Sequence, residues 1–223
     1  MNNLFTKILK NKRFILMSEI KIESPTEGNL GKLSDVERLA GLYQAGGADM
    51  ISAVTEKKMF GGNLGMIKEI KKISVLPVLC KDFIYRISQI DKVKKAGADA
   101  ILLIYFISGK EKLKKLYVQA VKSGLQPVVE VDNEEDLDEA ISEKYPVIAV
   151  NARNLRDFSV DREKAIKLLK KIPGDFISLA FSGVRDKEDV RKYVNCGAKG
   201  VLVGTSLMRA ENKSEFLKTL RLI

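Results

Sequence analysis

The chain of 223 residues contains no histidine and only two cysteines, Cys80 and Cys196, which lie far apart and form no CxxC pair. These absences exclude histidine-based catalytic triads and leave almost no ligand set for a zinc ion. We therefore expect no metal site. Any acid–base chemistry must be carried out by lysine, aspartate, glutamate, tyrosine or cysteine.

Long apolar segments are also missing. No run approaches the roughly 20 residues that a membrane-spanning helix needs, and the N-terminal segment MNNLFTKILKNKRF has lysines between its apolar patches and no small-residue cleavage site. We therefore expect a cytoplasmic protein with no membrane partner. Its length suits one domain over residues 1–223.

The charge balance is basic, with 39 Lys and Arg against 29 Asp and Glu and a net charge of +10. A basic surface can attract nucleic acid or anionic metabolites. Most of the lysines, however, alternate with acids in stretches typical of solvated helix faces, and no aromatic stacking motif accompanies them. We therefore expect a small anionic ligand and no nucleic acid.

Eight short apolar segments rich in Val, Ile and Leu recur about 25 residues apart, with amphipathic stretches between them. This pattern is typical of parallel strands covered by helices, and eight such units predict a (β/α)8 TIM barrel. An open doubly wound sheet is the alternative, but no GxGxxG follows the first strand. The predicted strands are residues 15–21, 50–55, 75–83, 100–106, 126–132, 147–153, 176–183 and 200–206.

Local signals support this division. Gly47, Gly97 and Gly197 stand in similar motifs (AGGAD, AGAD and CGAKG) before the second, fourth and eighth strands, where a left-handed residue would end each helix. Asn133 and Asp186 are expected to cap the helices that follow them.

Ser34 and Glu37 have the spacing of a capping box, in which the serine oxygen accepts an amide hydrogen bond and the glutamate reaches back to the cap. A helix is therefore predicted to begin at Ser34.

The functional groups of such a barrel lie at the C-terminal ends of its strands. Polar residues do cluster there, although each one alone could simply face solvent. Because inward-facing charges are costly unless they are paired, polar ends on five strands indicate one converging network. The residues are Glu19, Lys21, Lys81, Asp82, Glu130, Asn151, Arg153 and Ser182.

The last two strands end in FSGV and VGTS. Glycine allows the backbone to approach an anion closely, and these two strand ends are the usual phosphate location of a barrel. Gly183 and Gly204 are therefore expected to line a phosphate site.

Several longer segments resemble the indole-3-glycerol phosphate synthase family, in the expected order from about residue 15 to the C-terminus. TEKKMFGG and KDFI are the most specific. The segments are SEIKIESPTEG (18–28), SAVTEKKMFGGN (52–63), LPVLCKDFI (76–84), AGADAILLI (96–104), VVEV (128–131), VNARNL (150–155), FSGV (181–184) and VLVGTSLMRAE (201–211).

The resemblance implies a carboxy-lyase without metal or organic cofactor. That family closes the indole ring of 1-(2-carboxyphenylamino)-1-deoxyribulose 5-phosphate in tryptophan biosynthesis, releasing carbon dioxide and water. By resemblance, Lys81 is the general acid that protonates the substrate carbonyl oxygen, and Glu130 is its acidic partner. Lys21, paired with Glu19, lies near the phosphate and assists dehydration, and Asn151 holds the sugar hydroxyl.

The resemblance also implies the residues that bind substrate. Four apolar members of the set could equally be ordinary barrel packing. The phosphate contacts are Ser24, Gly183, Gly204 and Thr205; Arg153 and Ser182 contact the rest of the substrate; and Phe60, Phe83, Leu102 and Leu155 surround its aromatic ring.

The chain departs from the family pattern in two places. Phe181 stands where the family usually has a glutamate, and only 14 residues precede the first predicted strand, where the family has a longer helical extension over the barrel mouth. A sugar-phosphate isomerase, a phosphate-binding barrel of altered activity and a non-catalytic ligand-binding paralogue therefore stay as alternatives. A monomer or weak homodimer is expected.

Overall fold

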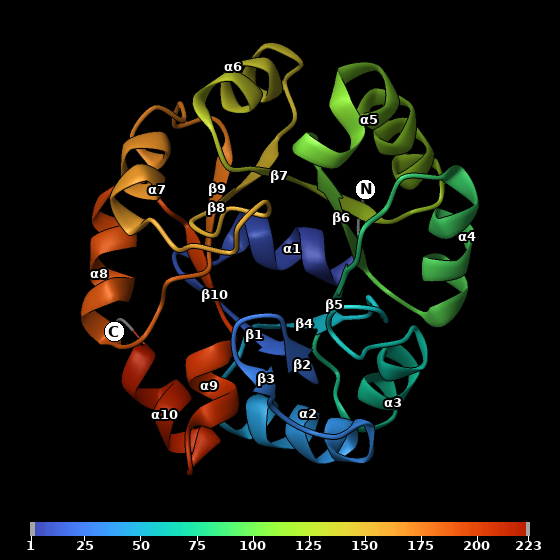
Figure 1. The fold of residues 1–223 in the computed structure, drawn as a ribbon, viewed down its shortest axis with the longest axis vertical. Helices are drawn as coiled ribbons and strands as arrows, with labels where there is room; N and C mark the ends of the chain where they lie inside the picture. The colour runs from blue at the N-terminus through green and yellow to red at the C-terminus, as the bar shows by residue number, and fades with distance from the viewer. Residues whose placement is uncertain (1–2, 222–223) are drawn as a thin grey trace.

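Eight parallel strands close into a barrel, with helices outside it (Figure 1). The structure, a computed structural model, describes residues 3–221. The predicted (β/α)8 barrel is therefore confirmed, with the neighbour order β1-β10-β9-β8-β7-β6-β5-β4. The strands are β1 (Ile15–Ile20), β4 (Met50–Val54), β5 (Val78–Lys81), β6 (Ala100–Ile104), β7 (Gln126–Val131), β8 (Val147–Asn151), β9 (Ile177–Phe181) and β10 (Gly200–Val203).

The helices form the outer layer of the barrel, apart from α1. None of the helices within residues 3–221 is long and apolar enough to cross a membrane. They are α1 (Leu4–Asn11), α2 (Val36–Ala45), α3 (Gly65–Ile73), α4 (Ile87–Ala96), α5 (Tyr105–Lys122), α6 (Glu134–Ser142), α7 (Arg162–Leu169), α8 (Lys187–Asn195), α9 (Thr205–Arg209) and α10 (Lys213–Leu220).

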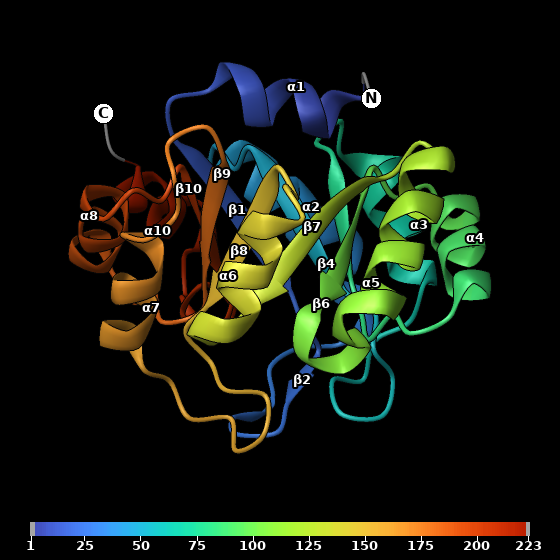
Figure 2. The same cartoon turned by 90° about the horizontal axis from the view of Figure 1, so that it is seen from above.

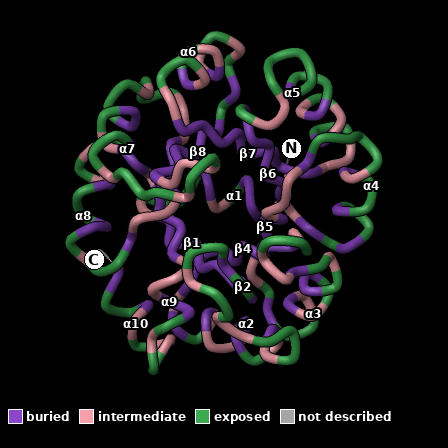
Figure 3. Tube along the Cα trace, in the orientation of Figure 1, coloured by how far each residue is buried: buried purple, intermediate pink, exposed green. Residues whose placement is uncertain are grey.

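The strands are buried on both faces, which explains their nearly continuous hydrophobicity (Figure 3). Alternate residues point to opposite sides, so Ile51 and Ala53 of β4 pack toward the helices while Met50 points into the barrel. The barrel interior is therefore a packed core, and ligands have access only to its ends.

Helix α1 covers the end of the barrel opposite the carboxyl ends of the strands (Figure 2). Its Phe5 and Leu9 are fully buried in the inner core, and the Asn3 side chain donates to the Asp99 carbonyl at 2.8 Å. No sequence pattern predicted this helix. Residues 4–11 lie at the end of the barrel opposite the mouth and do not cover the mouth.

The local signals were mostly correct. Gly47, Gly97 and Gly197 have φ values of +85°, +94° and +102° and so confirm the expected left-handed turns. The Asn133 and Asp186 side chains accept hydrogen bonds from backbone amides of the next turn, which confirms both caps.

The Ser34 capping box was wrong. Residues Leu33–Asp35 form a 3-10 turn, and α2 begins after Asp35 without a side-chain cap. A short hairpin of β2 (Glu23–Ser24) and β3 (Gly28–Asn29), which follows β1, was also not predicted.

Candidate active site

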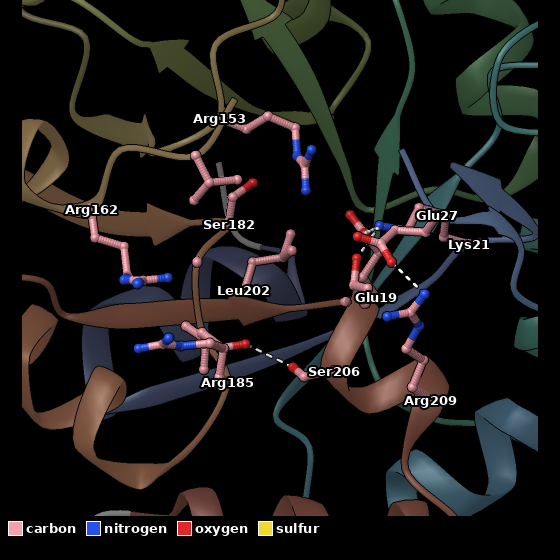
Figure 4. Close-up of a pocket in the computed structure, with 15 residues that line it drawn as sticks. Glu19, Lys21, Glu27, Arg153, Arg162, Ser182, Arg185, Leu202, Ser206 and Arg209 are labelled. Carbon is pink, nitrogen blue, oxygen red and sulfur yellow. Dashed lines mark hydrogen bonds and ion pairs between the residues drawn. The ribbon is translucent and has the colours of Figure 1, made fainter. Parts of the chain in front are cut away.

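Seven of the residues expected at the site line one cavity at the carboxyl end of the barrel (Figure 4). Its volume of about 370 Å³ falls within the range of small-molecule sites. The walls come from the ends of β1 and β10, from the segments after β8 and β9, and from α9. The seven residues are Glu19, Lys21, Arg153, Ser182, Gly183, Gly204 and Thr205.

A buried carboxylate joins two lysines at this mouth. Glu19 Oε1 lies 3.2 Å from Lys21 Nζ, and Glu19 Oε2 lies 3.6 Å from Lys81 Nζ. Burial favours a higher pKa for Glu19, but the two ammonium groups outweigh it and hold that pKa below the usual value. Glu19 is therefore a fixed negative charge that holds both lysines in place.

Lys21 connects this cluster to β10. Its ammonium donates to Thr205 Oγ1 at 3.0 Å. Gly204, the preceding residue, lies directly against the carboxylate, because a Cβ there would be 2.3 Å from Glu19 Oε1. Only glycine leaves room for the Glu19 side chain at this position.

The end of β9 has an unusual backbone. Ser182 and Gly183 have φ values of +66° and +81°, and a left-handed serine is uncommon. A Cβ on Gly183 would lie 2.7 Å from the Tyr193 hydroxyl, and that hydroxyl donates to the Ser182 carbonyl at 3.1 Å. Tyr193 therefore supports a turn that opens backbone groups toward the cavity.

A second, smaller cavity of about 20 Å³ lies next to the first. Phe60, Phe83, Leu102 and Leu155, the four apolar residues expected around an aromatic ring, all line it together with Lys81 and Glu130. The rings of Phe60 and Phe83 meet edge to face with 6.4 Å between centroids. Because Lys81 is paired with Glu19, the ion cluster spans both cavities.

Glu130 does not pair with Lys81 as expected. The ion pair of Lys81 within 4.0 Å is with Glu19, while Glu130 Oε1 accepts from Asn151 Nδ2 at 3.0 Å. Within residues 3–221, Glu130 Oε2 is buried without a hydrogen-bond partner. Burial raises the pKa of Glu130, although Lys81 and Asn151 oppose this shift.

Two expected residues contact neither cavity. The Asn151 side chain is occupied by Glu130 and by the Arg153 amide, which donates to Asn151 Oδ1 at 3.0 Å. Ser24 Oγ lies 3.3 Å from Thr26 Oγ1 in the β2–β3 hairpin. In this structure Asn151 therefore positions Glu130. Neither the Asn151 side chain nor the Ser24 side chain lines a cavity.

Phe181, the residue that departs from the family pattern, is 1% exposed and belongs to the inner core. It packs as an ordinary apolar residue one position before Ser182.

Four charged residues that line the larger cavity were not predicted from the sequence: Glu27, Arg162, Arg185 and Arg209. Arg209 forms an ion pair with Glu27, and Arg185 pairs with the buried Asp189 at 2.8 Å. Arg185 and Arg209 closely follow the FSGV and VGTS motifs, and this proximity was the signal available for them.

The ionisable groups that line the mouth are lysines, arginines and carboxylates. Cys80 lies beneath it, but burial raises the pKa of its thiol to about 12 and keeps it protonated. Within residues 3–221 no three acidic or cysteine side chains are grouped so that they could hold a metal ion.

Comparisons with known proteins agree on one family. The family model described as indole-3-glycerol phosphate synthase matches residues 1–220. Indole-3-glycerol phosphate synthases of Bacillus cereus and Bacillus anthracis are each 38% identical over 208 residues, which are 93% of this chain and 82% of the relative.

A solved thiamine phosphate pyrophosphorylase from Pyrococcus furiosus superposes with a TM-score of 0.63 and covers 95% of both chains at 18% identity. This likeness supports the fold alone.

Proposed function

The chain belongs to the indole-3-glycerol phosphate synthase family, and we propose that its chemistry is carried out by the Lys21–Glu19–Lys81 cluster together with Glu130. It is a decarboxylating lyase of tryptophan biosynthesis. Its substrate, 1-(2-carboxyphenylamino)-1-deoxyribulose 5-phosphate, has an apolar ring at one end and a phosphate at the other. The larger cavity has cationic side chains that suit the phosphate, and the smaller cavity has apolar side chains that suit the ring.

The larger cavity binds the phosphate in this proposal. Gly183 and Gly204 line this cavity, and Lys21 and Thr205 add a cation and a hydroxyl at hydrogen-bond distance from each other. Arg153, whose guanidinium points into the cavity in Figure 4, adds further positive charge. Ser182 is available to the sugar chain at the edge of this site.

The smaller cavity binds the aromatic ring among Phe60, Phe83, Leu102 and Leu155. Lys81 then lies between the ring and the sugar. When the ring carbon attacks the carbonyl carbon, Lys81 donates a proton to the oxygen that develops negative charge. Loss of carbon dioxide from the same ring carbon follows.

Dehydration completes the indole. The new hydroxyl group leaves as water with a proton from Lys21, and the anilino nitrogen supplies the electron pair for the double bond. Glu130, held by Asn151 at 3.0 Å, stabilises the positive charge that develops on that nitrogen. Loss of the proton from the adjacent carbon restores neutrality.

The observation that supports this mechanism best is the contact of one buried carboxylate with both lysines, at 3.2 and 3.6 Å. It holds the two proton donors at the boundary between a phosphate site and a ring site. Such preorganisation is where most catalytic stabilisation arises.

The test is turnover, followed by the appearance of indole fluorescence. The chain has no tryptophan, so the protein contributes little background. Lys81→Ala should abolish turnover, whereas Lys92→Ala, an exposed lysine on α4, should leave it unchanged. An unchanged rate in Lys81→Ala would refute the role of Lys81. Phosphate-ligand binding without turnover in the wild-type protein would instead indicate a non-catalytic barrel.

Two broader proposals accompany the family assignment. The enzyme acts in the cytoplasm, as expected for a biosynthetic family, and cell fractionation would test this location. It functions as a monomer or weak homodimer, because a barrel mouth built from one chain supplies the whole proposed site. Sedimentation equilibrium would test the oligomeric state.

A further inference from the structure

The ring cavity is too small for a ring in its present form. Its volume of about 20 Å³ compares with the roughly 150 Å³ of a cavity known to hold benzene. One wall must therefore move when the substrate binds. Most of the wall is fixed, because Val54, Lys81, Leu102 and Glu130 lie on strands of the barrel.

Two of the three loops that complete the wall are held in place by hydrogen bonds and close packing. Glu56 accepts from the Lys58 and Met59 amides at 2.9 and 2.7 Å within the loop that contains Phe60. Gly62 of this loop packs so closely on β4 that a Cβ would be 2.1 Å from the Val54 carbonyl oxygen.

The loop that contains Phe83 is similarly held. Gln89 binds the amides of Tyr85 and Arg86 and the carbonyl of Phe83, all at 2.9–3.0 Å. Movement of the Phe83 loop would break these bonds to α4, and movement of the Phe60 loop would break the 3.0 Å hydrogen bond from the Glu23 amide of β2 to the Phe60 carbonyl.

The third loop, residues 152–161 between β8 and α7, is different. Figure 2 shows it projecting beyond the carboxyl ends of the strands. Among the described hydrogen bonds, those made by residues 154–159 all stay inside the loop. The Asn154 amide donates to the Ser159 carbonyl at 2.9 Å, and Arg153 donates to the Phe158 carbonyl at 2.7 Å. Residues 154–159 can therefore move as one unit, while the ends of the loop stay anchored: the Ala152 amide donates to the Phe181 carbonyl at 2.9 Å and Arg153 donates to Thr26 Oγ1 at 3.4 Å.

This loop forms walls of both cavities. Leu155 lines the ring cavity and packs on the inner core, while Arg153 and Val160 line the phosphate cavity. Its tip also contacts another element: the Arg156 guanidinium lies 4.1 Å from the ring centroid of Phe106 in the first turn of α5. A cation over an aromatic face is attracted by its quadrupole.

We propose that the 152–161 loop is the gate of the ring cavity, and that the contact of Arg156 with Phe106 holds the gate in the closed position, in which Leu155 excludes the ring. This inference rests on the proposed function, because it takes the apolar cavity as the ring site. Arg156 and Phe106 are positioning residues that act through Leu155.

The first test is kinetic. Arg156→Gln and Phe106→Leu should each lower KM about two- to fivefold, the shift expected when one exposed cation–π contact no longer opposes opening of the gate, with kcat changed less than twofold. The double variant should lower KM no further than either single variant, and Arg156→Lys and Phe106→Tyr should restore most of the wild-type KM. Additive effects, or an unchanged KM, would overturn the proposal.

Arg86→Gln is the matched control. Arg86 lies over the Tyr85 ring at 5.2 Å, also at the mouth, but the two residues are neighbours in the chain and connect no separate elements. Its KM should stay at the wild-type value.

The second test uses the ligand-free protein. Phe106→Trp introduces the sole tryptophan of the chain, with one face covered by Arg156. Adding Arg156→Gln should increase quenching of its fluorescence by acrylamide. Equal quenching with and without Arg156 would show that no such contact covers the ring.

A third measurement separates the gate from the proposed catalysis. In Lys81→Ala, where no turnover is expected, adding Arg156→Gln should still tighten substrate binding two- to fivefold. Tightened binding together with full turnover by Lys81→Ala would refute the catalytic role and keep the gate. Unchanged binding with turnover lost in Lys81→Ala would refute the gate alone.

Discussion

Gly204 determines whether the Glu19 side chain can reach its position between the two lysines. A methyl group there would lie 2.3 Å from Glu19 Oε1, so Gly204→Ala must displace the carboxylate. Because a displacement of about 1 Å at a catalytic centre can cost roughly 100-fold in rate, we expect kcat/KM to fall by about that factor. Steady-state kinetics would measure it.

Gly174→Ala provides the control for this substitution. Gly174 has no heavy atom within 4 Å of an added Cβ and lies between α7 and β9, so its variant should keep full activity. Wild-type kinetics in Gly204→Ala would show that Glu19 tolerates displacement.

The two buried glutamates should respond oppositely to neutralisation. Burial raises the pKa of Glu130, so its ionised form is less stable in the folded protein than in the unfolded chain. Glu130→Gln should therefore raise the melting temperature at neutral pH while reducing turnover. The gain should grow as pH rises from the usual glutamate range through the raised pKa, and vanish at more acid pH.

Glu19→Gln is the counterpart. Lys81 and Lys21 outweigh burial and lower the pKa of Glu19, so its ionised form stabilises the fold. This variant should lower the melting temperature above the usual glutamate range, and the difference should disappear as pH falls through the lowered pKa. Calorimetry at several pH values would measure both variants, and shifts of the same sign would contradict the argument.

Individual site residues were predictable where strand geometry determines them. Glu19 and Lys21 are two apart, so a strand directs both to one side, and the register of the barrel brings Lys81 to the same mouth. The partner of Lys81 was not predictable, because pairing across the barrel depends on side-chain conformations. Arg162 was missed because it lies in a lysine-rich helical stretch interpreted as solvated.

At the scale of elements, α1 is a structural part of the barrel and not of the site. Phe5 and Leu9 fill the inner core at the end opposite the mouth. Phe5→Ala or Leu9→Ala should each lower the free energy of unfolding by about 2–5 kcal/mol, as for other large-to-small core substitutions. Turnover of the folded fraction should remain at the wild-type level.

Leu4→Ala is the appropriate comparison, because Leu4 is on the same helix and 45% exposed. Its effect on denaturant unfolding should be small. Loss of turnover in the folded Phe5→Ala protein would show instead that α1 influences the mouth.

The strands and most helices were predictable because their hydrophobic periods are strong and their caps are local. Asn133 bonds its own helix three residues on, which a sequence pattern can reveal. Ser34 has the same kind of pattern, but residues 33–35 form a 3-10 turn before α2 begins. The β2–β3 hairpin has only two residues per strand, too few for a periodic signal.

At the scale of the whole molecule, the net charge of +10 should attract an anionic substrate. Exposed lysines of the loop after β4, Lys57 and Lys58, lie near the mouth, whereas Lys7 and Lys10 lie on α1 at the other end. Since the screening length falls from about 30 Å at 0.01 M salt to about 8 Å at 0.15 M, kcat/KM should fall several-fold over this range while kcat stays constant.

Neutralising two lysines at a time, either near the mouth or at the far end, distinguishes a local electrostatic attraction from an effect of the total charge. Replacing Lys57 and Lys58 by glutamine removes two charges near the mouth, and the same change at Lys7 and Lys10 removes two from the far end. If attraction acts over roughly one screening length, the first variant should lower kcat/KM at low salt and flatten its salt dependence, and the second should do neither. Equal effects of the two variants would mean that the total charge matters and its placement does not. The lysines on the outer helices, such as those of α3, α4 and α5, would then contribute as much to substrate capture as the cations at the mouth.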